Sequence, residues 1–134
     1  MVELDIWQWV LPNDLTDFII TNLFEQPRLD SSALIRGRLP NDQTSAWLYT
    51  ANCYQAISGD DHEKFRRAAI SRGGSYSMEM CEFVVEDVLA SGDVVLNFWR
   101  RVRDDTGEGG RVILSQQTGA WRVAQQLGGW ENHP

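Results

Sequence analysis

The chain has 134 residues, of which 12 are Lys or Arg and 19 are Asp or Glu, so its formal net charge is −7. This acidic balance argues against a nucleic-acid partner, because phosphate binding relies on basic side chains and Lys64 is the only lysine. No apolar run approaches the roughly 20 residues of a membrane span, and no basic stretch followed by an apolar one opens the chain. We therefore expect a soluble, cytoplasmic protein, folded as a single domain over residues 1–134 with one core.

The N-terminal part of the sequence is expected to begin with a short strand or a helical lead-in over residues 4–11. Pro12, with Asn13 or Asp14 as the cap, predicts a helix start. An apolar stripe follows at helical spacing, and Pro27 ends the helix; the stripe consists of Leu15, Phe18, Ile19 and Leu23. The segment 29–39 is compatible with either a short helix or an edge strand.

Two further helices are predicted before residue 75. The first follows Pro40, with Asn41 or Asp42 as cap, and carries Trp47, Ala51 and Tyr54 on one face before Ser58-Gly59 ends it. The second begins at Asp60-Asp61, which cap its first turn, and ends at Gly73-Gly74. Its inward residues are expected to be Phe65, Ala68 and Ala69, whereas His62, in the first turn, is expected to be exposed and without a catalytic role.

The C-terminal half reads as four strands, beginning with Met80 to Leu89. In the second run Val94, Leu96 and Phe98 alternate with Val95, Asn97 and Trp99, the period of a strand packed on one side. Arg111 to Gln117 and the run from Trp121 to Leu127 flank Thr118-Gly119, a pair suited to a tight hairpin. The sequence thus predicts an α+β fold, with N-terminal helices packed on one face of a curved, mainly antiparallel C-terminal sheet.

Three short motifs occur in a fixed order: Tyr54-Gln55-Ala56-Ile57-Ser58-Gly59-Asp60, then Ser91-Gly92-Asp93-Val94-Val95, then Thr118-Gly119-Ala120-Trp121-Arg122-Val123. In this order they resemble the nuclear transport factor two-like superfamily, also called the cystatin-like cone fold, over residues 44–127. The forty residues before this region depart from the pattern, since many members have one long helix there. The resemblance implies a cone-shaped cavity between helices and sheet, which members use as an active site, a ligand pocket or a dimer scaffold.

A non-enzymatic pocket for a small apolar ligand is the main functional hypothesis, favoured by the six tryptophans in the chain. Its wall would consist of residues predicted to point inward, though the same residues would also suit a plain core; they are Trp47, Tyr54, Phe83, Phe98 and Trp121. An alternative is an interaction module, most simply a homodimer, joined through Val95, Trp99 and Ile113 on the open sheet face.

A cavity enzyme of isomerase, hydrolase or cyclase type is the third hypothesis, with Tyr54, Glu82, Asp87 and Arg101 beside Trp99 as candidates. We assign no catalytic residue, because Glu82, Glu86 and Arg101 are more simply explained as cross-strand charge pairs. The sequence has no phosphate loop, nucleophile elbow or metal-binding pattern, so we expect neither cofactor nor metal. Cys53 and Cys81 are expected to be buried, reduced thiols.

Overall fold

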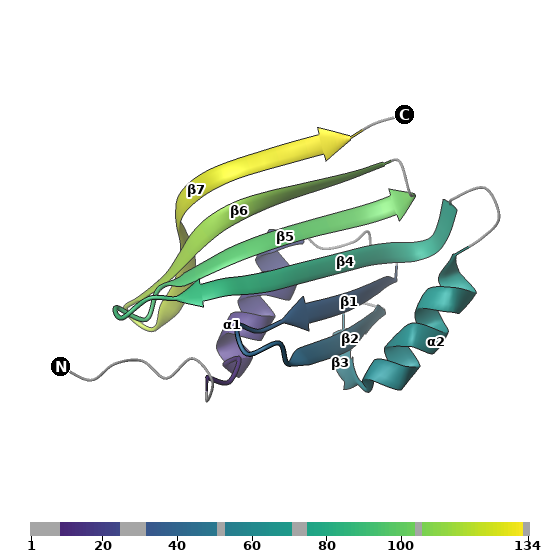
Figure 1. The fold of residues 1–134 in the computed structure, drawn as a ribbon, viewed down its shortest axis with the longest axis horizontal. Coiled ribbons are helices and arrows are strands. Elements are labelled where there is room, and N and C mark those ends of the chain that lie inside the picture. Colours follow the sequence, from purple (N-terminus) through teal and green to yellow (C-terminus); the bar gives the residue numbers. More distant parts are fainter. Residues whose placement is uncertain (1–8, 25–31, 51–52, 71–74, 104–105, 133–134) are drawn as a thin grey trace.

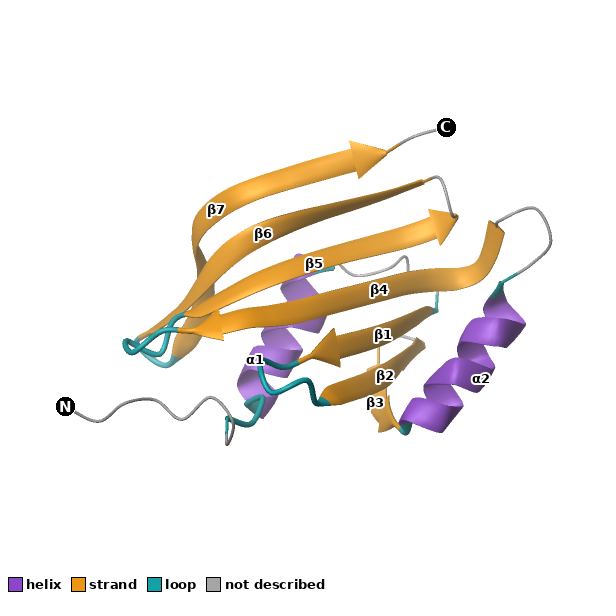
Figure 2. Cartoon of the chain, in the orientation of Figure 1, coloured by secondary structure: helices purple, strands orange, loops and turns teal. Residues whose placement is uncertain are grey.

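The computed structural model describes residues 9–24, 32–50, 53–70, 75–103 and 106–132. Helix α1 (Asn13–Phe18) continues into a π-helical turn, η1 (Ile19–Leu23), and is followed by strands β1 (Ala33–Arg38), β2 (Thr44–Thr50) and β3 (Cys53–Ile57). Helix α2 (Gly59–Ala69) then leads to β4 (Ser75–Val88), β5 (Val94–Arg103), β6 (Thr106–Gln117) and β7 (Ala120–Asn132). The expected α+β class and the C-terminal antiparallel meander are confirmed (Figures 1 and 2).

The seven strands form one sheet in the order β3-β2-β1-β4-β5-β6-β7. Neighbouring strands are antiparallel except for β1 and β4, which pair in parallel from Ala33 opposite Glu79 to Arg38 opposite Val84. Parallel neighbours need a long crossover connection. Here β2, β3 and α2 together form it, and α2 carries the chain from the edge strand β3 past β2 and β1 to β4.

The helix predicted between Pro40 and Gly59 is wrong, because this segment forms β2 and β3. The ambiguous segment before it is a strand too, β1. Asn41 and Asp42 belong to the turn between β1 and β2, in which Asp42 has a φ of 65° and the Leu39 N–H donates to the Gln43 carbonyl at 2.8 Å. Tertiary pairing overrides the helical spacing, since β2 lies between two strands that satisfy its backbone groups.

Helix α1 begins where the sequence predicts, although the cap and the buried face differ. Pro12 occupies the N-cap without a side-chain cap bond, so neither Asn13 nor Asp14 serves as the cap. The turn at Ile19 widens, and the Phe24 N–H donates to the Ile19 carbonyl at 3.3 Å. Leu15 and Ile19 are buried as expected, whereas Phe18 and Leu23 are half-buried and Ile20 and Phe24 take the inner positions after the wide turn. The expected helix end, Pro27, lies outside the described residues.

Helix α2 also confirms a predicted helix, with a different cap and a different inner face. The Ser58 hydroxyl, rather than an aspartate, accepts the cap bond, from the Asp61 N–H at 3.0 Å. Ala69 is buried as predicted, but Phe65 is 37% exposed and His62 takes the inner position in the first turn, with 5% of its surface exposed. The helix ends at Ala69, earlier than the predicted end at Gly73-Gly74, which lies outside the described residues.

The two helices lie on opposite faces of the sheet, and not on one face as expected. Ile35 of β1 belongs to the core cluster together with α1, whereas its neighbour Leu34 lines a hollow with His62 and Arg66 of α2. Successive residues of a strand point to opposite faces. The helices therefore sandwich the part of the sheet around β1 and β4 (Figure 1).

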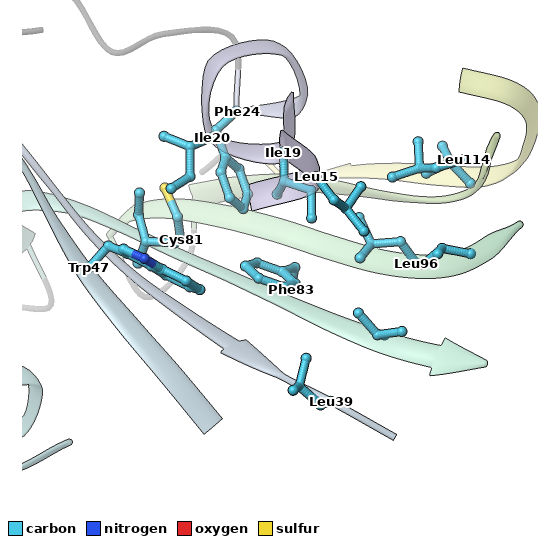
Figure 3. Packing of buried hydrophobic residues seen from close by; sticks show 14 of the residues in the cluster. Leu15, Ile19, Ile20, Phe24, Leu39, Trp47, Cys81, Phe83, Leu96 and Leu114 are labelled. Atoms are coloured by element: carbon cyan, nitrogen blue, oxygen red, sulfur yellow. The ribbon is translucent and has the colours of Figure 1, made fainter. Parts of the chain in front are cut away.

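The main core fills the space between α1 and the sheet (Figure 3). Leu15, Ile19, Ile20 and Phe24 from α1, η1 and the residue after it meet a broad apolar sheet face, and this face includes Ile35, Trp47, Tyr49, Cys81, Phe83, Val85, Leu96, Val112 and Leu114. At its centre the rings of Trp47 and Phe83 stack, with centroids 5.8 Å apart and planes at 22°. Because Gly37 pairs with Phe83 across β1 and β4, the ring lies over a residue that has no side chain.

Strands β6 and β7 bend strongly near their shared turn (Figure 1). The register between them shifts twice, between Arg111 and Val112 and again between Ile113 and Leu114. Each register shift places one extra residue in a strand, and such a bulge bends the strand and increases its twist. The bend brings the N-terminal end of β7 toward α1, where the Gln116 amide donates to the Asp14 carboxylate at 3.0 Å.

We expect Gly37→Ala to lower the free energy of unfolding by about 1–3 kcal/mol, the usual cost of overpacking a core. A Cβ at this position would collide with the Phe83 ring, which the stacked Trp47 holds in place. Urea denaturation of the single variants and of Gly37→Ala with Phe83→Leu measures the coupling. The cost of Gly37→Ala should shrink in the Phe83→Leu background, and an equal cost in both backgrounds would contradict this account.

Candidate functional site

The five residues predicted to line a ligand pocket do not converge on one cavity. Trp47 and Phe83 are 7% and 1% exposed and form the centre of the core. Tyr54 is half-buried on β3, and its hydroxyl donates to the Asp17 carboxylate at 3.1 Å. Burial and this bond raise the pKa of Tyr54. Trp121 is half-buried at the margin of the core cluster, while Phe98 lines a hollow.

This hollow, which we call the η1 pocket, lies between the end of η1 and strands β5 to β7 and has a volume of about 510 Å³. It is lined by Leu23, Phe24, Phe98, Arg100, Glu108, Gly109, Gly129, Trp130 and Glu131. The expected cavity beside a helix bearing Trp47 and Tyr54 is wrong in its location, because those residues are on strands. Of the residues expected to line the cavity, only Phe98, on the sheet, lines the η1 pocket.

Two rows of paired residues explain why the η1 pocket exists. One row runs from Phe98 through Gly110 to Gly129, and the next runs from Arg100 through Glu108 to Glu131. Paired residues point to the same face, and the Phe98 ring covers Gly110, since a Cβ there would lie 3.3 Å from its Cζ. Gly129, the next position of the row, has no side chain to fill the space beyond the ring. A Cβ on Gly129 would meet only the Gly109 carbonyl oxygen, at 3.4 Å.

Arg100 fixes the wall of the η1 pocket. Its Nε donates to Glu108 Oε1 at 2.6 Å, and its Nη1 donates to the Phe24 carbonyl at 2.7 Å. The second bond satisfies a carbonyl group at the end of the helical segment. The Phe24 ring meets Phe98 edge to face, with centroids 6.1 Å apart. The pocket thus combines a fixed aromatic wall with a charged row of one arginine and two glutamates.

A second hollow, which we call the α2 groove, lies on the opposite face of the sheet and has a volume of about 380 Å³. Helix α2, β1, β4 and β5 contribute its lining, which consists of Leu34, His62, Arg66, Ile70, Tyr76, Met80, Cys81, Glu82, Trp99 and Arg101. Sequence reasoning missed His62 here, because the first turn of a helix is usually exposed. The feature of the sequence that could have revealed it is the spacing of His62, Arg66 and Ala69, which places all three residues on one helix face.

Burial lowers the pKa of His62, and the positive charge of Arg36 lowers it further, against smaller opposite effects of Glu82 and Glu63. His62 is therefore a neutral imidazole near neutral pH. Glu63 itself accepts hydrogen bonds from Arg66 at 2.9 and 2.8 Å and from Arg67 at 3.1 Å. These arginines lower its pKa to about 2.

Glu82 and Glu86 form ion pairs between strands, whereas Asp87 forms a local backbone bond. Glu82 contacts Arg36 at 3.0 Å, and Glu86 contacts Arg111 at 2.6 Å. The expected charge pairing is therefore confirmed, but the partners are Arg36 and Arg111 and not Arg101. Asp87 accepts a bond from the Val88 N–H at 2.9 Å. Arg101 lies over the ring of Trp130, 5.4 Å from its centroid. Among the described groups, neither hollow contains a nucleophile in hydrogen-bonding contact with a base.

The three residues predicted for an interface share the face opposite α1. Val95 and Ile113 are paired across β5 and β6, and Trp99 is paired with Gly109. Val95 is buried, whereas Trp99 and Ile113 are half-buried. Trp130 continues the same row beyond Gly109, so the structure brings the three residues together on one surface with a further tryptophan.

The two cysteines differ in their environment. Cys81 is buried and free, and its burial raises the pKa of the thiol, whereas Cys53 is exposed, so the expected burial of Cys53 is wrong. Within the described ranges, His, Cys, Asp and Glu form no cluster of three or more suited to a metal ion. None of the described helices combines the length and apolar character needed to cross a membrane.

Comparison with protein-family models, with curated proteins and with solved structures finds no match to this chain. The resemblance to the nuclear transport factor two-like superfamily stays a prediction. Its first motif, read as the end of a helix, lies in β3 and the start of α2.

We expect the free energy of unfolding to fall as the pH is lowered from 7 toward 5.5. The unfolded chain binds a proton at His62 with a pKa near 6.5, while the folded protein holds that pKa lower. Protonation therefore favours the unfolded state, and the stabilising contribution is complete only above about pH 6.5.

Urea denaturation at several pH values measures this slope, with His62→Gln as the test variant and His133→Gln as the control. The test variant should have a flatter slope between pH 7 and 5.5 than the natural chain and the control. Glu63 titrates near pH 2 and lies outside this window. An unchanged slope in His62→Gln would show that the imidazole titrates alike in both states.

Proposed function

We propose that this protein binds a small amphipathic molecule in the η1 pocket, with the apolar part of the ligand against Phe24 and Phe98. The observation that carries the proposal is Gly129, which lines the hollow in the same cross-sheet row as Phe98 and has no side chain to fill it. The hollow beside the aromatic wall has a volume of about 510 Å³. This volume lies within the usual range for small-ligand sites, roughly 300–1,000 Å³.

The wall is preorganised, which favours binding because little order has to be created when the ligand enters. Arg100 links the Phe24 carbonyl to Glu108, and the edge-to-face contact sets the angle between Phe24 and Phe98. The apolar wall suits the apolar body of a ligand. Of the residues in this wall, Phe98 was expected from the sequence to contact such a ligand. The row of Arg100, Glu108 and Glu131 offers both donors and acceptors to a polar end.

Two adjacent glycines of β7 provide a matched test. Gly129 lines the pocket, whereas Gly128 is paired with Arg111 on the other face, and a Cβ there would meet no atom within 4 Å. Gly129→Leu would fill the hollow, and Gly128→Leu would add the same side chain to the opposite surface.

We expect the natural chain and Gly128→Leu to bind the apolar dye Nile red with 1:1 stoichiometry, and Gly129→Leu to lose at least about tenfold in affinity, because a leucine side chain occupies the ligand volume. Dye fluorescence measures the affinity, and circular dichroism checks that both variants are folded. Equal affinities for the two variants, or no saturable dye binding by the natural chain, would contradict the pocket.

A homodimer joined through the open sheet face is the second candidate function. It is favoured by the row of Trp99, Gly109 and Trp130 beside the pair of Val95 and Ile113, on the face opposite α1, where α2 packs against β1, β2 and β4. Burying such a face in a two-fold contact removes apolar surface from water.

For this second candidate we expect sedimentation at tens of micromolar to show a dimer that Ile113→Glu converts to a folded monomer, because a carboxylate would be buried unpaired in the contact. Val123→Glu is the control, since Val123 is paired with Leu114 on the opposite face. A monomeric natural chain at this concentration would exclude the dimer.

A further inference from the structure

We infer that the α2 groove is a second binding site, which takes a small planar aromatic anion with its ring on Trp99 and its acidic group at Arg66 and Arg101. This site lies on the opposite face of the sheet from the η1 pocket and does not depend on the function proposed for that pocket.

The groove arises because α2 is shorter than the strands beside it. The helix packs against β1, β2 and β4 and ends at Ala69, where Ile70 bridges to Tyr76. β4 and β5 continue, with Met80 paired with Arg101 and Glu82 with Trp99. These residues form a floor beside the helix, and the resulting volume of about 380 Å³ suits a molecule of one or two rings.

Positive charge gathers around the groove although the whole chain carries a net charge of −7. Arg36 and Glu82 balance each other in a direct ion pair. Glu63, in contrast, is shared by Arg66 and Arg67, so one carboxylate faces two guanidinium groups. Arg101 lines the other wall, with its guanidinium over the Trp130 ring. An anion bound here therefore meets the guanidinium groups of Arg66 and Arg101.

The contact between Arg66 and Glu63 does not prevent Arg66 from binding a ligand. The pair is formed within one helix, three residues apart, and the two side chains are 41% and 37% exposed. Exposed pairs of this kind contribute little to stability. Arg66 donates to Glu63 through Nε and Nη2, so its Nη1 can donate to a ligand carboxylate while the pair stays intact.

The floor of the groove selects a flat apolar body. Trp99 is half-buried, and its partner across the sheet is Gly109, over which the Trp130 ring lies, so an indole rather than a β6 side chain borders it. The thioether of Met80 and the side chain of Leu34 extend the apolar surface. An aromatic ring stacks favourably on an indole, and His62 at the helix wall adds a neutral polar group whose ring is buried.

The test is calorimetric titration of the whole chain with 1-naphthoate, compared with 1-naphthamide, which has the same ring system without the charge. We expect 1:1 binding of the acid, with the amide at least about tenfold weaker, as charge-assisted hydrogen bonds to arginine imply. Trp99→Leu should abolish binding of both compounds. Equal affinity for acid and amide would overturn the inference, and so would the absence of naphthoate binding at millimolar concentration.

Arg66→Gln and Arg67→Gln form a matched pair, because both arginines contact Glu63 but only Arg66 lines the groove. We expect Arg66→Gln and Arg101→Gln each to weaken naphthoate binding about tenfold and Arg67→Gln to leave it unchanged. Similar losses in Arg66→Gln and Arg67→Gln would show a diffuse charge effect and overturn the site. Gly129→Leu should keep full naphthoate affinity; loss of binding in this variant would place naphthoate in the η1 pocket instead.

Discussion

The parallel pairing of β1 with β4 is the contact on which the rest of the structure depends. It joins the N-terminal strands to the C-terminal meander and requires the long connection through α2. Because α1 covers one face of these strands and α2 the other, β1 is buried on both sides: Ala33, Leu34 and Ile35 are each at most 1% exposed. The close approach of Gly37 to Phe83 lies in the same pairing.

Both hollows follow from the way the sheet extends beyond its two helices. On the α1 side, the long strands β5 to β7 continue past η1, and Gly129 of β7 leaves the η1 pocket unfilled. On the α2 side, the helix ends before the strands do, and Trp99 and Arg101 form an uncovered floor. The two sites differ in charge, since Arg100 lies with Glu108 and Glu131 in the first, whereas arginines predominate around the second.

Local sequence signals were sufficient where an element satisfies its own backbone or pairs with a neighbour in sequence. Helix α1 begins after Pro12, α2 begins after Ser58, and the hairpin turns at Gly92 and Gly119, both with positive φ, join the predicted strands. The alternation of Val94, Leu96 and Phe98 with Val95, Asn97 and Trp99 correctly divided the two faces of β5. The cross-strand pairing of Glu82 and Glu86 also followed from the sequence, though not their partners.

The sequence by itself determined the α+β class, the helix starts and the faces of the C-terminal strands, because these depend on spacing and turn residues within a few positions. Only the tertiary structure decided that residues 44–50 and 53–57 are strands. Trp47 and Tyr54 fit helical spacing equally well, and it is the pairing of Trp47 with Ile35 and Ala56 that fixes the strand. It alone placed α2 on the face opposite α1, because a parallel crossover has no local signature. For the same reason it alone brought His62 and Trp99 into one groove and Phe24 and Gly129 into one pocket: these contacts join residues far apart in the chain.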